Sequence, residues 1–278
     1  MMMPKPDVVA LTGGYRKTPF LQIGADIYCD TALILEVLEH VEPEPSLFPG
    51  QSAGLARALA QWADNTLFWA AIRVNRGPKG AGLKISGVAP EVAKSLFDDR
   101  KAMGFDMDWV RPADAAAPFQ SYLSRLSEIL GNKPYLMGAT PCVADFAAIH
   151  SLWYLYIRPG AAMSMAEVDA QLQAWILRMT AIGHGHREDI DAAQAIEIAA
   201  RSEPLPVDQQ HLKAGSFVDD HGIALGSQVA ISAESFGLEQ TRGELIAATA
   251  THYSLRRVDA RAGNVHVHFP RIGYVLKT

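Results

Sequence analysis

Cysteine is scarce in this sequence, which has two, Cys29 and Cys142, far apart among its 278 residues. A disulfide scaffold needs more cysteines in a smaller chain, so we interpret both as free thiols in a cytoplasmic protein. Long apolar runs are missing too, because none reaches the ~20 residues that a membrane-spanning helix needs. Residues 1–7 also lack the apolar core of a signal peptide. The sequence therefore predicts no membrane partner.

An excess of basic residues is also missing. The chain carries 25 Lys and Arg against 30 Asp and Glu, a net charge of −5. Residues 215–278 balance six basic against six acidic side chains. Nucleic-acid-binding proteins usually present a basic stripe, so we expect no nucleic-acid partner. The 49% of hydrophobic residues is typical of a folded chain with a core.

Recognisable metal-ligand spacing is a further absence. His266 and His268 would point to one face of a strand, as two ligands do, and His184 and His186 form a second pair. A zinc site, however, needs three or four ligands at characteristic spacings. No Cys, Asp or Glu cluster lies close to either pair in the sequence, so we expect no metal.

The pattern of the first residues predicts a short α/β segment. Residues 7–12 favour a brief helix, and the apolar runs 20–23 and 27–29 around a Gly-Ala-Asp turn predict a β-hairpin. Asp30 and Thr31 then cap a helix that ends before the prolines at 43 and 45.

From about Ser52 to Arg201 the apolar spacing is helical only. The first of these helices would place six residues on one face: Leu55, Leu59, Trp62, Thr66, Trp69 and Arg73. Residues 77–87, rich in Gly and Lys, predict a loop. Ser164 and Glu167 form the pattern of a capping box and predict that a helix starts there. After a proline-containing linker, short strand-like runs punctuated by glycine fill residues 215–278.

Two joints in this layout carry a resemblance to a known family. The first is Arg16-Lys17-Thr18-Pro19-Phe20-Leu21 followed by Ile27-Tyr28-Cys29-Asp30-Thr31. The second is Tyr135-Leu136-Met137-Gly138 followed by Pro141-Cys142-Val143-Ala144-Asp145-Phe146. In this order they resemble the glutathione S-transferases. The resemblance covers about residues 5–185, and Asp-Thr replaces the Glu-Ser pair that is common in the family.

The resemblance implies a fold of three parts. A partial thioredoxin-like α/β segment over residues 1–46 would be followed by an all-α helical domain over 47–201 and a linker over 202–214. Residues 215–278 would form a small all-β domain, which resembles an SH3-like barrel at Gly226–Ile231, Gly243–Leu245 and Leu255–Arg257. Family members are usually homodimers.

The resemblance also implies a glutathione site. The backbone of Thr18, held by a cis peptide bond before Pro19, would pair with the extended peptide. The amides at the helix start and the Thr31 hydroxyl would take the γ-glutamyl carboxylate, Asp30 its ammonium, and Arg16 and Lys17 the glycyl carboxylate. The alternative is that Asp30 only caps its helix and Pro19 only shapes a turn.

The residue that activates the thiol is not identified. In the family a Ser, Tyr or Cys near the first strand and helix does this, and here the match begins at the family's second helix, with no such residue before Thr12. We therefore expect a thioredoxin-like segment without its first strand, helix and second strand, impaired catalysis, and an open edge on the strand over 20–23.

The resemblance further places an electrophilic small molecule against Trp62, Trp69 and Arg73, although core packing explains the two tryptophans as well. At the second joint, Asp145 would cap its helix in partnership with Cys142, whose thiol is a weak acceptor. The predicted function is conjugation or thiol exchange of glutathione with an electrophile. A non-catalytic binding or assembly module of the same shape is the alternative, so whether the chain is an enzyme stays open.

Overall fold

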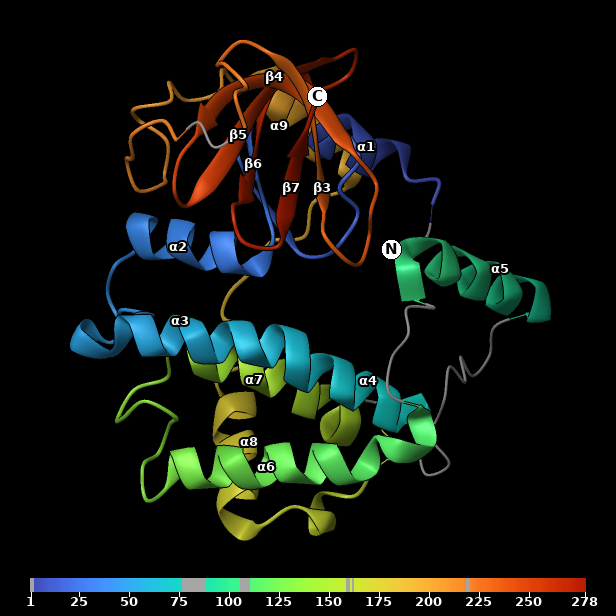
Figure 1. The fold of residues 1–278 in the computed structure, drawn as a ribbon, viewed down its shortest axis with the longest axis vertical. Coiled ribbons are helices and arrows are strands. Elements are labelled where there is room, and N and C mark those ends of the chain that lie inside the picture. Colours follow the sequence, from blue (N-terminus) through green and yellow to red (C-terminus); the bar gives the residue numbers. More distant parts are fainter. Residues whose placement is uncertain (1–2, 77–88, 106–110, 159–160, 162, 219–220) are drawn as a thin grey trace. The chain divides into compact units, whose positions relative to one another are not determined.

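A computed structural model describes residues 3–76, 89–105, 111–158, 161, 163–218 and 221–278 (Figure 1). Two compact units divide the chain. Unit 1 comprises Met1–Val41, Val88–Met107 and Glu188–Thr278, and unit 2 comprises Glu42–Gly87 and Asp108–Arg187. The boundaries that the sequence predicts at 46, 201 and 214 stay a prediction, and the loop predicted over 77–87 lies outside the described residues.

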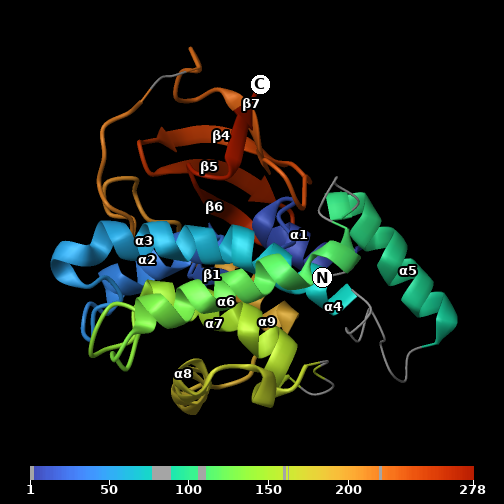
Figure 2. The same ribbon diagram turned by 60° about the horizontal axis from the view of Figure 1, so that its bottom comes forward.

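Unit 1 is built on a mixed sheet, which has seven strands in the described part of the chain and the order β1-β2-β6-β5-β4-β3-β7. The strands are β1 (Phe20–Ile23), β2 (Asp26–Cys29), β3 (Gln228–Ala233), β4 (Thr241–Ala248), β5 (His252–Asp259), β6 (Gly263–Pro270) and β7 (Tyr274–Lys277). The hairpin β1–β2 is the predicted one. All neighbours pair antiparallel except β2 and β6, which pair parallel. Figure 2 shows β4, β5 and β6 side by side.

The predicted SH3-like barrel is not confirmed. Within the described residues, the C-terminal strands continue the sheet of the N-terminal hairpin, and this sheet is not closed because β1 and β7 lie at its two ends. The physical reason is the second edge of β2, whose backbone groups need partners. They pair with β6 at Asp26–His266, Ile27–Val267 and Tyr28–His268. The far edge of β1 has no partner strand in the described residues.

Alternation along β2 divides the core of unit 1 between two faces of the sheet. Ile27 and Cys29 point into the larger cluster, together with residues of α1 (Pro6–Thr12) and α9 (Ala192–Ala200). Tyr28 points the other way, into a smaller cluster with α2 (Thr31–Val41). This arrangement brings the turn before β1 and the start of α2 to one end of the hairpin.

Unit 2 is helical in its described residues. Its α-helices are α3 (Ala53–Trp62), α4 (Phe68–Arg76), α6 (Ala116–Leu130), α7 (Val143–Leu152) and α8 (Ala170–Ala181). The π-helical turns η2 (Ala63–Leu67) and η5 (Trp153–Ile157) continue α3 and α7, and η1 (Gly50–Ser52), η4 (Pro112–Asp114) and η6 (Met165–Glu167) are 3-10 turns. The helix α5 (Pro90–Arg100) and the π turn η3 (Lys101–Phe105) belong to unit 1.

The face of α3 that the apolar spacing selects is not the face that the structure buries most deeply. Leu55 is 64% exposed, whereas the buried residues are Ala56, Ala60, Ala63, Leu67, Ala70, Ala71 and Val74. Several alanines of α7 are buried as well, at 144, 147 and 148, and α3 packs against α7. Small side chains let two helix backbones approach closely, so α3 and α7 can pack against each other without large side chains between them. The π turn η2 also shifts the helical register between Trp62 and Trp69.

The predicted start of α8 at Ser164 is also wrong. The Ser164 hydroxyl accepts a hydrogen bond from Ala166, but it caps only the short turn η6. The helix itself begins at Ala170, where the Asp169 carboxylate accepts from the amides of Gln171 and Leu172 at 3.1 and 3.0 Å. An ionised cap next to a helix N-terminus also interacts favourably with the helix dipole.

Asp145 connects three parts of unit 2. It is fully buried in the first turn of α7 and accepts from the Cys142 amide at 3.0 Å, the Leu136 amide at 2.9 Å and Trp175 Nε1 at 2.8 Å. The Cys142 thiol donates to the same carboxylate at 3.3 Å. Burial and the charge of Asp145 raise the pKa of Cys142 to about 11, so this thiol stays protonated at neutral pH.

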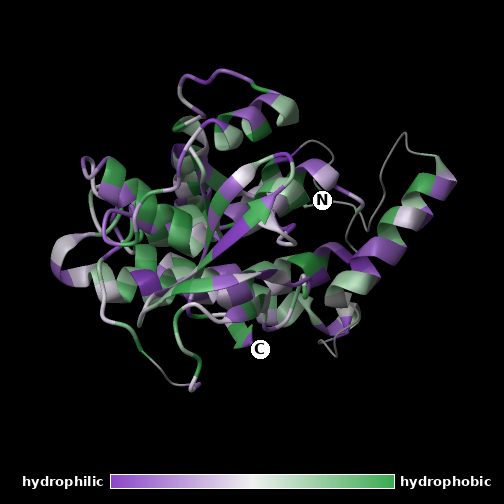
Figure 3. Cartoon of the chain, turned by 90° about the horizontal axis from the view of Figure 1, so that it is seen from above, coloured by the Kyte–Doolittle hydropathy of each residue, from purple (hydrophilic) through white to green (hydrophobic). Residues whose placement is uncertain are grey.

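Hydrophobic and hydrophilic residues are mixed along the helices and strands (Figure 3). In the ranges that the structure describes, no helix has the length and apolar character needed to cross a bilayer.

The buried His252 gives unit 1 an expected sensitivity to acid. It is 4% exposed at the start of β5, and its Nδ1 lies 3.0 Å from both Thr249 Oγ1 and Thr251 Oγ1. Burial, assisted by the charge of His268, lowers its pKa from 6.5 to about 4. The unfolded chain therefore binds more protons between these values, so stability is complete above pH 6.5 and falls as the pH drops towards 4. We expect a loss of up to about 3 kcal/mol.

Urea unfolding measured from neutral pH down to pH 4 tests this expectation. His252→Gln should flatten the pH dependence of the unfolding free energy, whereas the same change at the exposed His184 should leave it unaltered. An equally steep dependence in His252→Gln would contradict the assignment.

Candidate functional site

The segment before β1 exposes an unpaired stretch of backbone. The peptide bond between Thr18 and Pro19 is cis, and both residues are exposed. The ladder of the hairpin starts only at Phe20, which is opposite Cys29. Among the described residues, neither the amide nor the carbonyl of Thr18 has a hydrogen-bond partner. This stretch can therefore accept an extended peptide in the manner of a strand edge.

Asp30 lies beside this stretch in a strained conformation. Its φ of 79° is in the left-handed region, which only Asp30 adopts among the non-glycine residues described. Such backbone geometry costs free energy and tends to occur at functional positions. The Asp30 carboxylate accepts from the Ala32 amide at 3.1 Å and so caps α2. The Asp30 side chain remains 26% exposed, so a ligand can still reach the carboxylate that caps the helix.

Lys17 provides the cation next to Asp30. Its Nζ lies 3.8 Å from Asp30 Oδ2, 5.5 Å from the centre of the Tyr15 ring and 4.9 Å from the centre of the Tyr274 ring. Burial lowers the pKa of Lys17, and the charge of Asp30 opposes this shift. The structure therefore brings Lys17, Thr18, Pro19, Asp30 and Thr31 together at one end of the hairpin.

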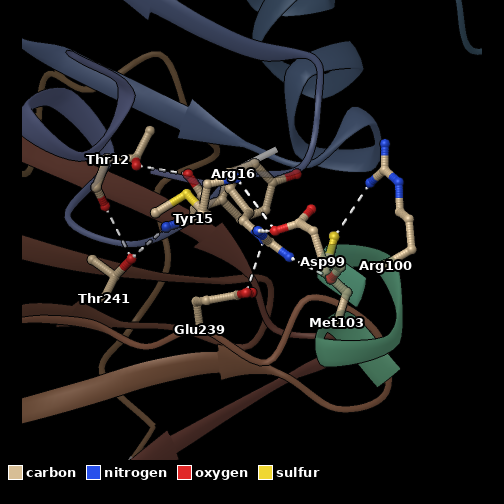
Figure 4. Close-up of polar contacts among 9 residues, drawn as sticks. Thr12, Tyr15, Arg16, Asp99, Arg100, Met103, Glu239 and Thr241 are labelled. Carbon is tan, nitrogen blue, oxygen red and sulfur yellow. Dashed lines mark hydrogen bonds and ion pairs between the residues drawn. The ribbon is translucent and has the colours of Figure 1, made fainter. Parts of the chain in front are cut away.

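Arg16 is engaged elsewhere. Its side chain is 2% exposed, with Nη1 at 2.6 Å from Asp99 Oδ1 and Nε at 2.8 Å from Glu239 Oε1 (Figure 4). Burial acts to raise the pKa of Asp99, but hydrogen bonds from Arg16 and from the Met3 amide lower it overall. Two carboxylates therefore already neutralise the guanidinium that the sequence assigned to the glycyl carboxylate.

Neither Tyr15 nor Cys29, which lie close to this site, is arranged to activate a thiol. The Cys29 thiol is fully buried, and burial together with Asp30 raises its pKa. Burial also raises the pKa of the Tyr15 hydroxyl, with Cys29 and Asp30 acting in the same direction. Both groups remain protonated at neutral pH and so supply no base, and both are buried, so neither is placed to donate a hydrogen bond to a ligand thiolate.

The histidines of β6 form a buried polar cluster with Asp26. His268 Nε2 lies 2.9 Å from Asp26 Oδ1, and its Nδ1 lies 2.8 Å from Ser254 Oγ. His266 lies on the same face, with Nδ1 at 3.8 Å from Asp26 Oδ1. Burial lowers the pKa of both histidines against the effect of Asp26. In the described part of the chain, no three His, Cys, Asp or Glu side chains are arranged to hold a metal.

Comparison with solved structures identifies the family. A GST-like protein from Pseudomonas syringae is similar over 100% of this chain and 88% of its own, with 37% sequence identity and a TM-score of 0.76. The chain belongs to the GST-like proteins. Lower similarity is found to a glutathione S-transferase from Rhodospirillum rubrum (19% identity, TM-score 0.42, 64% of this chain and 72% of that one). The β-etherase LigF from Sphingobium is 22% identical, with a TM-score of 0.39, over 56% of this chain and 70% of its own. No protein-family model and no curated protein matches.

In this GST-like protein, the residues predicted to contact the electrophile lie in unit 2. Trp62, Trp69 and Arg73 are half-buried at the end of α3 and in α4. Trp62 contacts Tyr122 edge to face, with ring centres 5.6 Å apart, and Trp69 does the same with Phe68 at 5.3 Å. Each tryptophan therefore packs one side within unit 2 and keeps part of its surface accessible.

Sequence reasoning missed one residue at the Asp30 site. The Tyr274 hydroxyl, at the start of β7, donates to Asp30 Oδ2 at 2.9 Å. No motif surrounds Tyr274 in the sequence, and 244 residues separate it from Asp30. The residue pattern of the tail favours strands, but it does not indicate which residues of the N-terminal segment those strands contact.

Proposed function

We propose that this GST-like protein binds glutathione at the end of the β1–β2 hairpin and joins it to an electrophilic small molecule by conjugation or thiol exchange. The Thr18 backbone would pair with the cysteinyl unit. The Thr31 amide and hydroxyl would bind the γ-glutamyl carboxylate, and Asp30 the ammonium. Lys17, and not Arg16, would supply the cation for a carboxylate of the ligand.

The geometry of Asp30 is the observation that carries this proposal. A zwitterionic amino-acid end needs an anion, a cation and free amides within a few ångströms. Asp30 offers the anion 3.8 Å from the Lys17 ammonium, at the start of a helix whose first amides lack intrahelical partners. The strained φ of Asp30 directs the chain into α2 while leaving its carboxylate accessible.

The reaction would be attack of the glutathione sulfur on an electrophilic atom. The thiol proton leaves to solvent, the sulfur forms the new bond, and the electron pair of the broken bond departs with the leaving group. Because Tyr15 and Cys29 are buried, we propose that neither side chain contacts the glutathione sulfur, so that thiol activation and hence catalysis are weak in this chain. The same observation favours the second candidate, a glutathione-binding module without catalysis.

Two further assignments belong to the proposal. Trp62, Trp69 and Arg73 would contact the electrophile through their accessible surfaces. We also propose a homodimer, which light scattering on the purified protein can test directly.

Calorimetric titration with glutathione tests the binding site. We expect saturable binding by the unaltered chain and a dissociation constant about tenfold higher for Asp30→Ala, because a charge-assisted contact is lost. Asp191→Ala is the matched control, since Asp191 caps α9 in the same unit and lies outside the proposed site. Folded protein that does not bind glutathione would overturn the proposal.

Turnover of a chlorodinitrobenzene by the same samples separates the two candidates. Glutathione-dependent product above the solution rate, lost in Asp30→Ala, supports the transferase. Tight binding without such product supports the binding module.

A further inference from the structure

A residue of the C-terminal strand β7, Tyr274, contacts both members of the Asp30–Lys17 ion pair. On one side, the Tyr274 hydroxyl donates to Asp30 Oδ2 at 2.9 Å. On the other side, the Tyr274 ring centre is 4.9 Å from Lys17 Nζ. An ammonium over an aromatic face is attracted by the ring quadrupole. A single residue of β7 therefore contacts the anion and the cation at once.

The segment that carries Lys17 is fixed by the same part of the chain. The Tyr15 amide donates to Thr241 Oγ1 at 3.3 Å, and Thr241 Oγ1 donates to the Thr12 carbonyl at 2.9 Å (Figure 4). At Gly14 a Cβ atom would lie 2.2 Å from the Gln240 carbonyl oxygen, so the backbones are in direct contact there. The segment that leads to Lys17 is therefore fixed against the residues at the start of β4.

Tyr274 is almost completely buried, whereas the side chains of Asp30 and Lys17 are each 26% exposed. A ligand can therefore reach the charged groups but not the tyrosine behind them. An Asp carboxylate with two free torsions would lose rotamer entropy on binding an ammonium. A buried hydroxyl that already holds one oxygen removes part of this cost, because the carboxylate is preorganised.

We infer that Tyr274 is a positioning residue for the amino-acid end of the γ-glutamyl group: it holds the Asp30 carboxylate for the ligand's ammonium and flanks the Lys17 cation. This inference rests on the proposed function and extends it to the C-terminal strand. It makes the β-segment after residue 215 a component of the binding site. The contact is directional, since the hydroxyl donates to Oδ2 while Oδ1 caps α2.

The experiment compares two ligands on two variants. Glutathione and glutaryl-cysteinyl-glycine, which lacks only the amino group, are titrated calorimetrically into the full chain, Tyr274→Phe and Tyr28→Phe. Phenylalanine keeps the ring and removes the hydroxyl. Tyr28 is the control because it is fully buried in the same unit, and its hydroxyl interacts with the His211 backbone and not with Asp30.

We expect Tyr274→Phe to raise the dissociation constant of glutathione about tenfold and that of the deaminated analogue less than about twofold. A purely structural role would weaken both ligands alike, so the selectivity between them is the decisive readout. Tyr28→Phe should change neither. Thermal melts establish folding, and if Tyr274→Phe is unstable, all titrations are repeated in trimethylamine N-oxide, which favours the folded chain.

The outcomes separate this inference from the function on which it rests. If the unaltered protein does not bind glutathione, both the proposed function and the positioning role of Tyr274 are overturned. Unaltered protein that binds glutathione, with Tyr274→Phe showing the same affinity or an equal loss for both ligands, overturns the positioning role alone.

Discussion

Replacing Asp145 with alanine is expected to lower the free energy of unfolding by about 4–5 kcal/mol, close to the upper limit for a single substitution. Three N–H donors, at Leu136, Cys142 and Trp175, point at its buried carboxylate. Alanine leaves all three in the core without an acceptor, and each unsatisfied buried donor costs about 1–3 kcal/mol. The loss falls on the junction of α7, α8 and the loop before them.

Urea unfolding followed by tryptophan fluorescence measures this loss, because Trp175 is one of the donors. Asp145→Asn keeps one acceptor oxygen and should lose less. Asp169→Ala removes a more exposed cap of α8 in the same unit, together with the hydrogen bond that Ser127 donates to it, and should cost only about 1–2 kcal/mol. Equal effects of Asp145→Ala and Asp169→Ala would show that the buried network adds nothing to ordinary capping.

Replacing Arg16 with alanine is expected to destabilise the chain by about 3–5 kcal/mol, the usual effect of breaking a buried ion pair. The guanidinium joins Asp99 at the end of α5 to Glu239 just before β4. Without it, two carboxylates face one another in a partly buried position. Since Arg16 is part of what keeps the pKa of Asp99 low, the variant should also raise that pKa.

Arg201→Ala provides the comparison for this experiment. Arg201 forms an exposed ion pair with Glu197 on α9 of the same unit, so its loss should cost no more than about 0.5 kcal/mol. Folded Arg16→Ala should still bind glutathione through Lys17. A stable Arg16→Ala variant that no longer binds glutathione would instead show that Arg16 contributes to ligand binding.

Local chemistry explains why the first elements could be predicted. The apolar runs of β1 and β2 surround a glycine turn, and Asp30 precedes an amphipathic helix, so each signal lies within a few residues. The Asp145 joint was also readable, because its pattern is short and specific. These elements form from nearest neighbours, and tertiary packing has little to change.

The buried face of α3 could not be predicted in the same way. Apolar spacing selects large side chains, but the interface with α7 is made by alanines such as Ala56, Ala60 and Ala148. Alanine carries a weak hydrophobic signal and is common on exposed helix surfaces as well. Close approach of two backbones is a property of the pair of helices, so one sequence pattern does not reveal it.

The start of α8 illustrates competition between two local signals. Ser164 and Asp169 both suit an N-cap, and both accept a backbone hydrogen bond. The first supports a single 3-10 turn, and the second supports twelve helical residues. The apolar residues Leu172, Trp175 and Met179 decide the outcome, because packing of that face provides most of the stability of a helix.

Sequence reasoning named only part of the proposed site. Lys17, Thr18, Pro19, Asp30 and Thr31 lie within the first joint and were found together. Tyr274 was missed because it lies in β7, which pairs with β3 at the opposite end of the strand order from β1. Strand order is set by non-local pairing, and a pattern of alternating residues leaves that order open.

The parallel pairing of β2 with β6 has a consequence for synthesis on the ribosome. Unit 2 is drawn from residues 42–187 and can begin to fold once that stretch has emerged. The hairpin at residues 20–29 can form locally, but the second edge of β2 must wait for β6, more than 200 residues later, and contacts of such sequence separation form slowly. The second edge of β2 therefore stays unpaired through most of translation, and an unpaired strand edge can pair with other chains in that interval.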